Sequence, residues 1–176
     1  MDLGKFLWER RKTIAKRWFE ALIDSYPDET SRFLKKQKDR FANPVGQTLS
    51  LGITQILEQL LGGQNTEGLR PALDPIIRIR AVQDFAPSQA LAFVFLLKKV
   101  LREELGKEGE GKGPVQELFD LEGRIDELAL LSFDLFMLCR EKIYELKASE
   151  LKHQTFRLLE RAKLVVESPL EKPSTA

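Results

Sequence analysis

The sequence predicts an all-α fold, a bundle of helices that ends in one long C-terminal helix. Apolar residues recur every three or four positions through most of the 176 residues, as they do when one side of a helix is buried. Capping residues and prolines mark where these segments begin and end. The one segment that alternates apolar and basic residues, 76–81, has no second strand to pair with, and a lone strand would leave its backbone groups unpaired.

Two helices are expected before residue 43. The first follows Asp2, a side chain suited to capping, and carries apolar residues at helical spacing from Leu3 to about Tyr26. Pro27 is expected to stop it, because proline has no backbone N–H to donate within a helix. Residues 28–41 then form a shorter helix.

A third helix starts at Asn43-Pro44, where a capping side chain precedes proline at the first helical position. Its apolar period persists until Gly62-Gly63, a common way for a helix to end. Asp74-Pro75 repeats the start signal and predicts a short helix from Pro75 to about Gln83.

Pro87 opens the next helix, and Gln89 is placed to reach back to the capping position. Residues 90–97 are all apolar, so we expect this helix to be the central buried element. Four glycines within residues 106–113 then predict a flexible loop.

The last helix is the longest. From Leu118 to Cys139 its apolar residues step by three and four, the rhythm of a helix-pairing seam. A second apolar side includes Phe119, Phe133 and Tyr144, so one side is expected to pack on the core and the other on a symmetry mate. The pattern weakens after residue 150, and we expect residues 168–176 to form a disordered tail.

The sequence shows no catalytic or metal-binding constellation. His153 lies in a polar segment without a second histidine, cysteine or carboxylate pair at ligand spacing, so neither a metal site nor a cofactor is expected. Cys139 has no histidine nearby in sequence and lies on the apolar seam, which favours an inert thiol. We therefore expect that the protein is not an enzyme.

Charge and hydropathy argue against nucleic acid and membranes as partners. The net charge is only +1, and the basic cluster Arg10 to Lys12 is better explained by a solvated helix face than by nucleic-acid contact. The longest apolar run has eight residues, far short of the roughly 20 that span a bilayer. The N-terminus lacks the apolar region of a signal peptide, so a cytoplasmic location is expected.

Arg78 and Arg80 are the candidate recognition residues. Two residues apart on a helix, they lie about 200° apart and cannot share one face. Either they form ion pairs within the chain, or they belong to an ion-pair cluster at a dimer or partner interface. The residues proposed for such an interface are charged groups and seam leucines: Arg78, Arg80, Asp84, Arg124, Asp126, Leu121, Leu128 and Leu135.

Three segments together resemble the N-terminal sensory domain of RsbT co-antagonist proteins of the RsbRD type. They are SRFLKKQKDRFANPVG, IIRIRAVQDFAPSQALAFVFLLKKVLREEL and RIDELALLSFDLFMLCREKIYEL. The resemblance covers about residues 3–150 and implies a globin-like helical bundle without haem that pairs as a dimer through its helices. It also implies a role in stress signalling. Ala86 departs from the pattern, which has serine there.

The resemblance implies a globin-like sensory domain over residues 1–150, followed by an extension of the last helix over 151–167. In the family a STAS domain follows, and 176 residues leave no room for one. We therefore expect either that the output passes through a protein partner or that this sequence is a piece of a longer protein. His153, the one imidazole, lies beyond the main seam, which agrees with a haem-free domain.

We therefore expect a non-catalytic regulatory domain that acts as a homodimer in a stress or metabolic signalling pathway. The alternative is a protein that binds a small apolar ligand in the pocket where a globin holds haem. That pocket would be lined by Phe85, Phe93, Phe95, Phe133 and Phe136, although aromatic residues at helical spacing are also typical of plain core.

Overall fold

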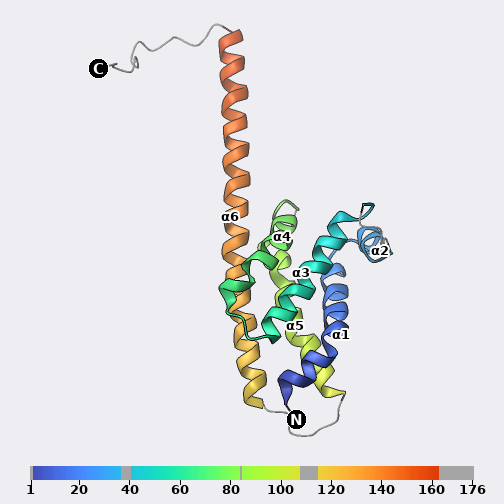
Figure 1. The fold of residues 1–176 in the computed structure, drawn as a ribbon. Coiled ribbons are helices and arrows are strands. Elements are labelled where there is room, and N and C mark those ends of the chain that lie inside the picture. Colours follow the sequence, from blue (N-terminus) through green and yellow to red (C-terminus); the bar gives the residue numbers. More distant parts are fainter. Residues whose placement is uncertain (1, 37–40, 84, 108–114, 163–176) are drawn as a thin grey trace, which may run out of the picture. The chain divides into compact units, whose positions relative to one another are not determined.

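A computed structural model describes residues 2–36, 41–83, 85–107 and 115–162 (Figure 1). The predicted all-α fold with a long C-terminal helix is confirmed, and the described ranges contain no strand. The helices are α1 (Leu3–Ile23), α2 (Asp28–Lys36), α3 (Pro44–Leu61), the 3-10 helix η1 (Thr66–Leu69), α4 (Arg70–Ala81), α5 (Pro87–Gly106) and α6 (Val115–Arg161). None of these helices is both long enough and apolar enough to cross a membrane.

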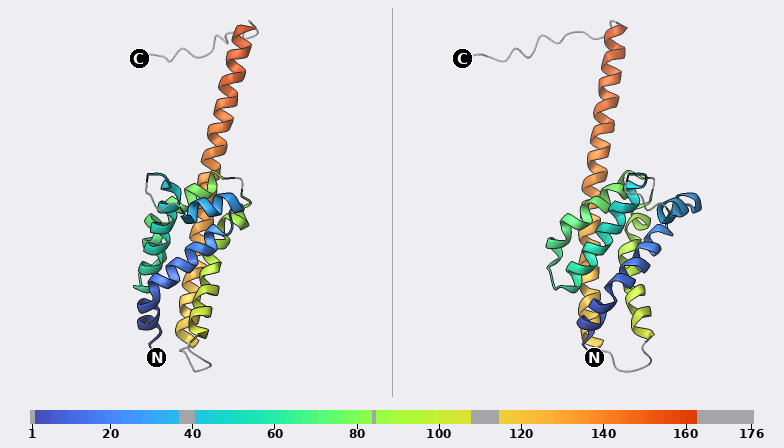
Figure 2. Two further views of the ribbon diagram at one scale, coloured as in Figure 1. Left: turned by 90° about the vertical axis from the view of Figure 1, so that its right-hand side faces the viewer. Right: turned by 45° about the vertical axis from the view of Figure 1, so that its right-hand side comes forward.

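The chain divides into two units at Cys139. In the first unit, α1 packs against α3 and α5, and α3 packs against α4 (Figure 2). Trp18 of α1 is fully buried at its centre, where its ring stacks on Phe93 of α5 with 6.2 Å between centroids. The indole Nε1 donates to the backbone oxygen of Phe93 over 2.7 Å, so the largest core side chain has its polar atom satisfied.

Three predicted helix starts are confirmed by capping contacts. The backbone N–H of Lys5 donates to Asp2 at the start of α1, and that of Gly46 donates to Asn43 at the start of α3. At the start of α5, the side chain of Gln89 accepts from the backbone N–H of Ala86 over 3.1 Å. This last bond forms although Ala86 has no side-chain acceptor of its own to complete the reciprocal pair.

The predicted start of the fourth helix at Pro75 is wrong. α4 begins at Arg70, directly after η1, and Pro71 occupies the first turn, where a backbone N–H is not needed. Pro75 therefore lies inside the helix, and Asp74 does not cap it. Asp74 instead accepts from Arg78 one turn further on, over 2.5 Å.

Two other expectations need adjustment. α2 ends at Lys36, and residues 37–40 of the segment expected to be helical lie outside the described residues. α5 is not buried on all sides, since Phe95 is 51% exposed while Phe93 and Val94 are buried. Residues 108–113 of the expected loop and the expected tail from residue 168 also lie outside the described ranges.

Candidate interaction surface

Arg80 lies in the core of its own chain. Its side chain is fully buried, and its guanidinium donates to the backbone oxygens of Ala90 and Gln89 at the start of α5 over 2.7 and 2.9 Å. It also donates to the hydroxyl of Ser25. These contacts join the end of α1, the end of α4 and the start of α5, so Arg80 is not available to an interface, contrary to expectation.

Three aromatic rings surround the same guanidinium. Its carbon lies 4.4 Å from the ring centroid of Phe85, 5.1 Å from that of Tyr26 and 5.9 Å from that of Phe93. The Nη1 atom is buried and has no hydrogen-bond partner among the described residues. Among the described residues no carboxylate pairs with Arg80, so its charge is stabilised by carbonyl dipoles and ring faces.

The other charged residues proposed for an interface have separate partners within the chain. Arg78 is exposed and pairs with Asp74, whose contact raises the pKa of the guanidinium. Arg124 donates to the backbone oxygen of Gln64, and Asp126 pairs with Lys98. Asp84 lies outside the described residues. The structure therefore does not bring the proposed cluster together.

The three seam leucines, Leu121, Leu128 and Leu135, are buried in the first unit. The apolar seam predicted from residue 118 to 139 thus packs on the core of its own chain, and the thiol of Cys139 at its end is partly covered. Burial raises the pKa of that thiol. Any contact with a second copy must therefore use the opposite side of α6.

Arginines of the basic face on α1 are paired with carboxylates. Arg17 contacts Glu103 and Glu104 of α5, and Arg10 lies 3.6 Å from Glu104. Arg11 lies 3.5 Å from Glu58 of α3. The positive charge on this face is therefore balanced locally.

α5 and α6 run side by side and antiparallel (Figure 2), and two ion pairs connect them. Arg102 forms a bidentate contact with Glu122 at 2.6 and 2.7 Å, which lowers the pKa of that carboxyl. One turn further along, Lys98 donates to Asp126 over 2.7 Å. These ion pairs hold the side of α5 that carries Lys98 and Arg102 next to the side of α6 that carries Glu122 and Asp126.

An exposed apolar stripe follows the same side of α6 as these acidic residues. Leu130 is 69% exposed, Phe133 is 48% exposed, and Met137 lies one turn after Phe133. The steps of three and four residues put these side chains on one face of the helix, together with Phe119 nearer the start of α6. We name Phe119, Leu130, Phe133 and Met137 the α6 stripe.

In the second unit, described through residue 162, α6 continues to Arg161. Tyr144, Leu151 and Leu158 are exposed and seven residues apart, and the small residues Ala148 and Thr155 lie four residues after the first two. Large and small residues that alternate in steps of four and three form the seam of a coiled coil. His153 is exposed in this unit.

The five phenylalanines proposed for a ligand pocket lie in different surroundings in the described residues. Phe93 and Phe136 are packed in the core, and Phe85 contacts Tyr26 edge to face. Phe95 and Phe133 are about half exposed at the surface. The reason is the helical period, because Phe95 lies about 200° from Phe93 and Phe133 about 60° from Phe136 around their helices.

Sequence comparison links the chain to known proteins. Residues 12–151 match the family model of the RsbT co-antagonist protein rsbRD N-terminal domain. An uncharacterized protein of Archaeoglobus fulgidus is 27% identical over 145 residues, which cover 80% of this chain and 83% of that protein. No solved structure matches the sequence.

Proposed function

We propose that this chain, which belongs to the family of RsbT co-antagonist protein rsbRD N-terminal domains, is a non-catalytic regulatory domain that acts as a homodimer. The family is one of sensory and regulatory domains in a stress-signalling context and is not a known enzyme family. The observation that carries the proposal is the exposed α6 stripe.

The α6 stripe is apolar surface that association would remove from water. Burying a large apolar side chain contributes about 1.5–3 kcal/mol, so the four members favour a partner together. Contiguous apolar patches on a soluble domain commonly mark interaction sites. The neighbouring carboxylates Glu122 and Asp126 already have partners on α5, so burial of these two groups leaves neither charge unpaired.

A second copy of the chain is the partner we favour. A two-fold contact needs a self-complementary surface, and one apolar helix face meets this condition because it can pack against its own copy. In the second unit, Tyr144, Leu151 and Leu158 would form a parallel two-stranded coiled coil, with Ala148 and Thr155 allowing close approach. A signal would then reach a protein partner through the geometry of the paired helices.

Substitution of Leu130 tests the dimer. Glutamate in the middle of the α6 stripe would place two like charges at the two-fold contact, so Leu130→Glu is expected to weaken association at least tenfold in sedimentation equilibrium. Leu51→Glu is the matched control, because Leu51 of α3 is also more than half exposed but lies outside the α6 stripe. A wild-type chain that is monomeric at micromolar concentration would contradict the proposal.

A further inference from the structure

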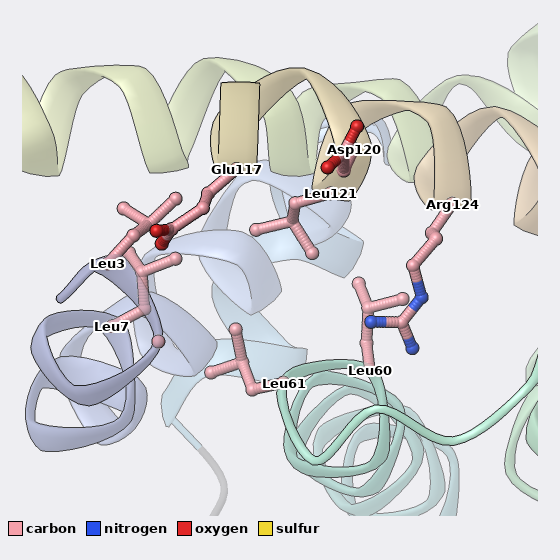
Figure 3. Close-up of a pocket in the computed structure, with 9 residues that line it drawn as sticks. Leu3, Leu7, Leu60, Leu61, Glu117, Asp120, Leu121 and Arg124 are labelled. Carbon is pink, nitrogen blue, oxygen red and sulfur yellow. The ribbon is translucent and has the colours of Figure 1, made fainter. Parts of the chain in front are cut away.

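A cavity of about 230 Å³ lies at one end of the first unit, where the start of α1, the end of α3 and the first turns of α6 meet (Figure 3). Its walls include buried leucines from all three helices, Leu3 and Leu7 of α1, Leu60 of α3 and Leu121 of α6. At about 30 Å³ for one water molecule, the volume corresponds to roughly seven or eight waters, enough for a small organic molecule.

Charged groups of both signs border this apolar space. Figure 3 shows Glu117 directed toward Leu3 and Leu7, and Arg124 directed toward Leu60, with Leu121 between them. Glu117 and Arg124 are seven residues apart on α6, which puts them on the same side of the helix and about 10.5 Å apart along its axis. The cavity therefore has a carboxylate near one end and a guanidinium near the other.

The two groups differ in how they are held. Arg124 donates from Nη2 to the backbone oxygen of Gln64 over 2.6 Å, which fixes the guanidinium and leaves its other donors for a ligand. The carboxylate of Glu117 is exposed and has no hydrogen bond or ion pair with another described residue. The third charged group, Asp120, already accepts from Gln116 over 2.9 Å.

We propose that this cavity binds an α-amino acid with an apolar side chain. The ammonium group would donate to Glu117, the carboxylate would accept from Arg124, and the side chain would lie among the leucines. Two hydrogen bonds of about 2.9 Å and the ~3 Å between the charged atoms of an amino acid span about 9 Å, a length similar to the rise of about 10.5 Å between the backbone positions of Glu117 and Arg124 on α6.

Small apolar ligands with a single charge would pair with only one of the two charged groups, Glu117 or Arg124. An apolar amine would leave Arg124 without an anion, and an apolar carboxylate would meet Glu117 and Asp120. Glu117 is exposed and Arg124 is partly exposed, so an analogue that lacks one of the two charges loses a charge-assisted hydrogen bond but leaves no buried group unpaired. In a sensory domain this ligand would be the signal, a role that rests on the proposed function, whereas binding itself does not.

Isothermal titration calorimetry of the full chain tests the site with five probes. L-leucine is expected to bind, and 3-methylbutan-1-amine, 4-methylpentanoate and glycine are each expected to bind at least tenfold more weakly. If the amine or the carboxylate binds as tightly as leucine, recognition of the zwitterion is refuted. If neither L-leucine nor L-phenylalanine binds at 10 mM, the proposal fails, and the dimer is judged separately by sedimentation.

Variants locate the site. Glu117→Gln and Arg124→Gln are expected to weaken leucine binding at least tenfold, while Asp134→Asn, an exposed position on the same helix, leaves it unchanged. Leu61→Trp tests the cavity without removing a fully buried side chain, since Leu61 is only partly buried and its larger replacement would fill the space. Unchanged affinity in Glu117→Gln and Leu61→Trp would place the ligand elsewhere and overturn the assignment.

Discussion

Arg80 shows how one residue connects three helices of the first unit. Its three donated hydrogen bonds reach the end of α1 and the start of α5 from the end of α4. An arginine guanidinium stays charged in proteins, so burial without a carboxylate has a desolvation cost. The same burial lowers the pKa of Arg80. The aromatic faces and backbone oxygens around it offset part of that cost.

Substitutions at Arg80 and Arg78 should separate the two arginines. Arg80→Ala removes a fully buried side chain and its hydrogen bonds, and we expect a loss of about 2–5 kcal/mol in the free energy of unfolding. Arg80→Met, which keeps most of the volume without the charge, should lose less. Arg78→Ala should leave stability nearly unchanged, because Arg78 is exposed and its ion pair is on the surface. Urea denaturation measures all three.

If Arg80→Ala unfolds at the wild-type urea midpoint but loses dimerisation, Arg80 acts at an interface and its placement in the core is wrong.

Glu104 should make stability depend on pH. Hydrogen bonds from Lys107 and then Arg17 lower the pKa of this nearly buried carboxyl, although burial alone would raise it. A carboxyl with a lower pKa in the folded state contributes stability above its unfolded pKa of about 4.3 and loses it as the pH falls through the folded value. The free energy of unfolding should therefore fall between pH 5 and pH 3.

Glu104→Gln tests the origin of this dependence. The variant should be less stable than wild type at pH 7, and the difference should shrink toward pH 3. Glu9→Gln, at an exposed position of α1, should leave the pH profile unchanged. Parallel profiles for wild type and Glu104→Gln would rule out Glu104 as the source.

At the scale of elements, Gly52 allows α3 and α4 to pack closely. A Cβ atom built at Gly52 would lie 2.8 Å from Cδ1 of Ile76 and 3.0 Å from the backbone oxygen of Ala72. Gly123 of α6 is the opposite case, since a Cβ there meets nothing within 4 Å. Both glycines are inside helices, so alanine has the same intrinsic advantage of about 1 kcal/mol at each.

Gly52→Ala and Gly123→Ala form a matched pair. Gly123→Ala should raise the free energy of unfolding by about 0.5–1 kcal/mol. Gly52→Ala should lower it, because overpacking costs about 1–3 kcal/mol and outweighs the gain in helix propensity. Thermal or urea unfolding compares the two, and equal stabilisation would show that α3 and α4 have room to move apart.

Local signals predicted most helices because capping is local. Asp2, Asn43 and Gln89 each contact a backbone group three residues away, so their roles are visible in sequence. Asp74-Pro75 has the same capping-residue-then-proline pattern as Asn43-Pro44, but no helix starts there. α4 already begins at Arg70, directly after the 3-10 helix η1. η1 and α4 both pack against α3, and such contacts between helices are not visible in the local pattern around Asp74.

At the scale of the whole molecule, contacts between distant residues could not be predicted. The helical period predicted that Arg78 and Arg80 lie on different faces of their helix. It could not predict that Arg80, and not Arg78, is the buried one. The burial of Arg80 depends on Tyr26 and Phe93, which are distant in sequence. The cavity beside Glu117 likewise joins Leu3, Leu60 and Leu121, which share no sequence pattern.

Association of two copies through α6 can be tested by replacing Leu151 with cysteine. In a parallel coiled coil, residues of the seam face their own copies, so Leu151→Cys in a Cys139→Ser background should form an intermolecular disulfide under mild oxidation. Leu146→Cys is the control, because Leu146 is 60% exposed against 64% for Leu151 but lies about 140° away around the helix.

Non-reducing gel electrophoresis gives the measurement. We expect a covalent dimer for Leu151→Cys within minutes of oxidation at micromolar concentration and mostly monomer for Leu146→Cys. Equal cross-linking at the two positions, or none at Leu151, would contradict pairing of two copies along this side of α6.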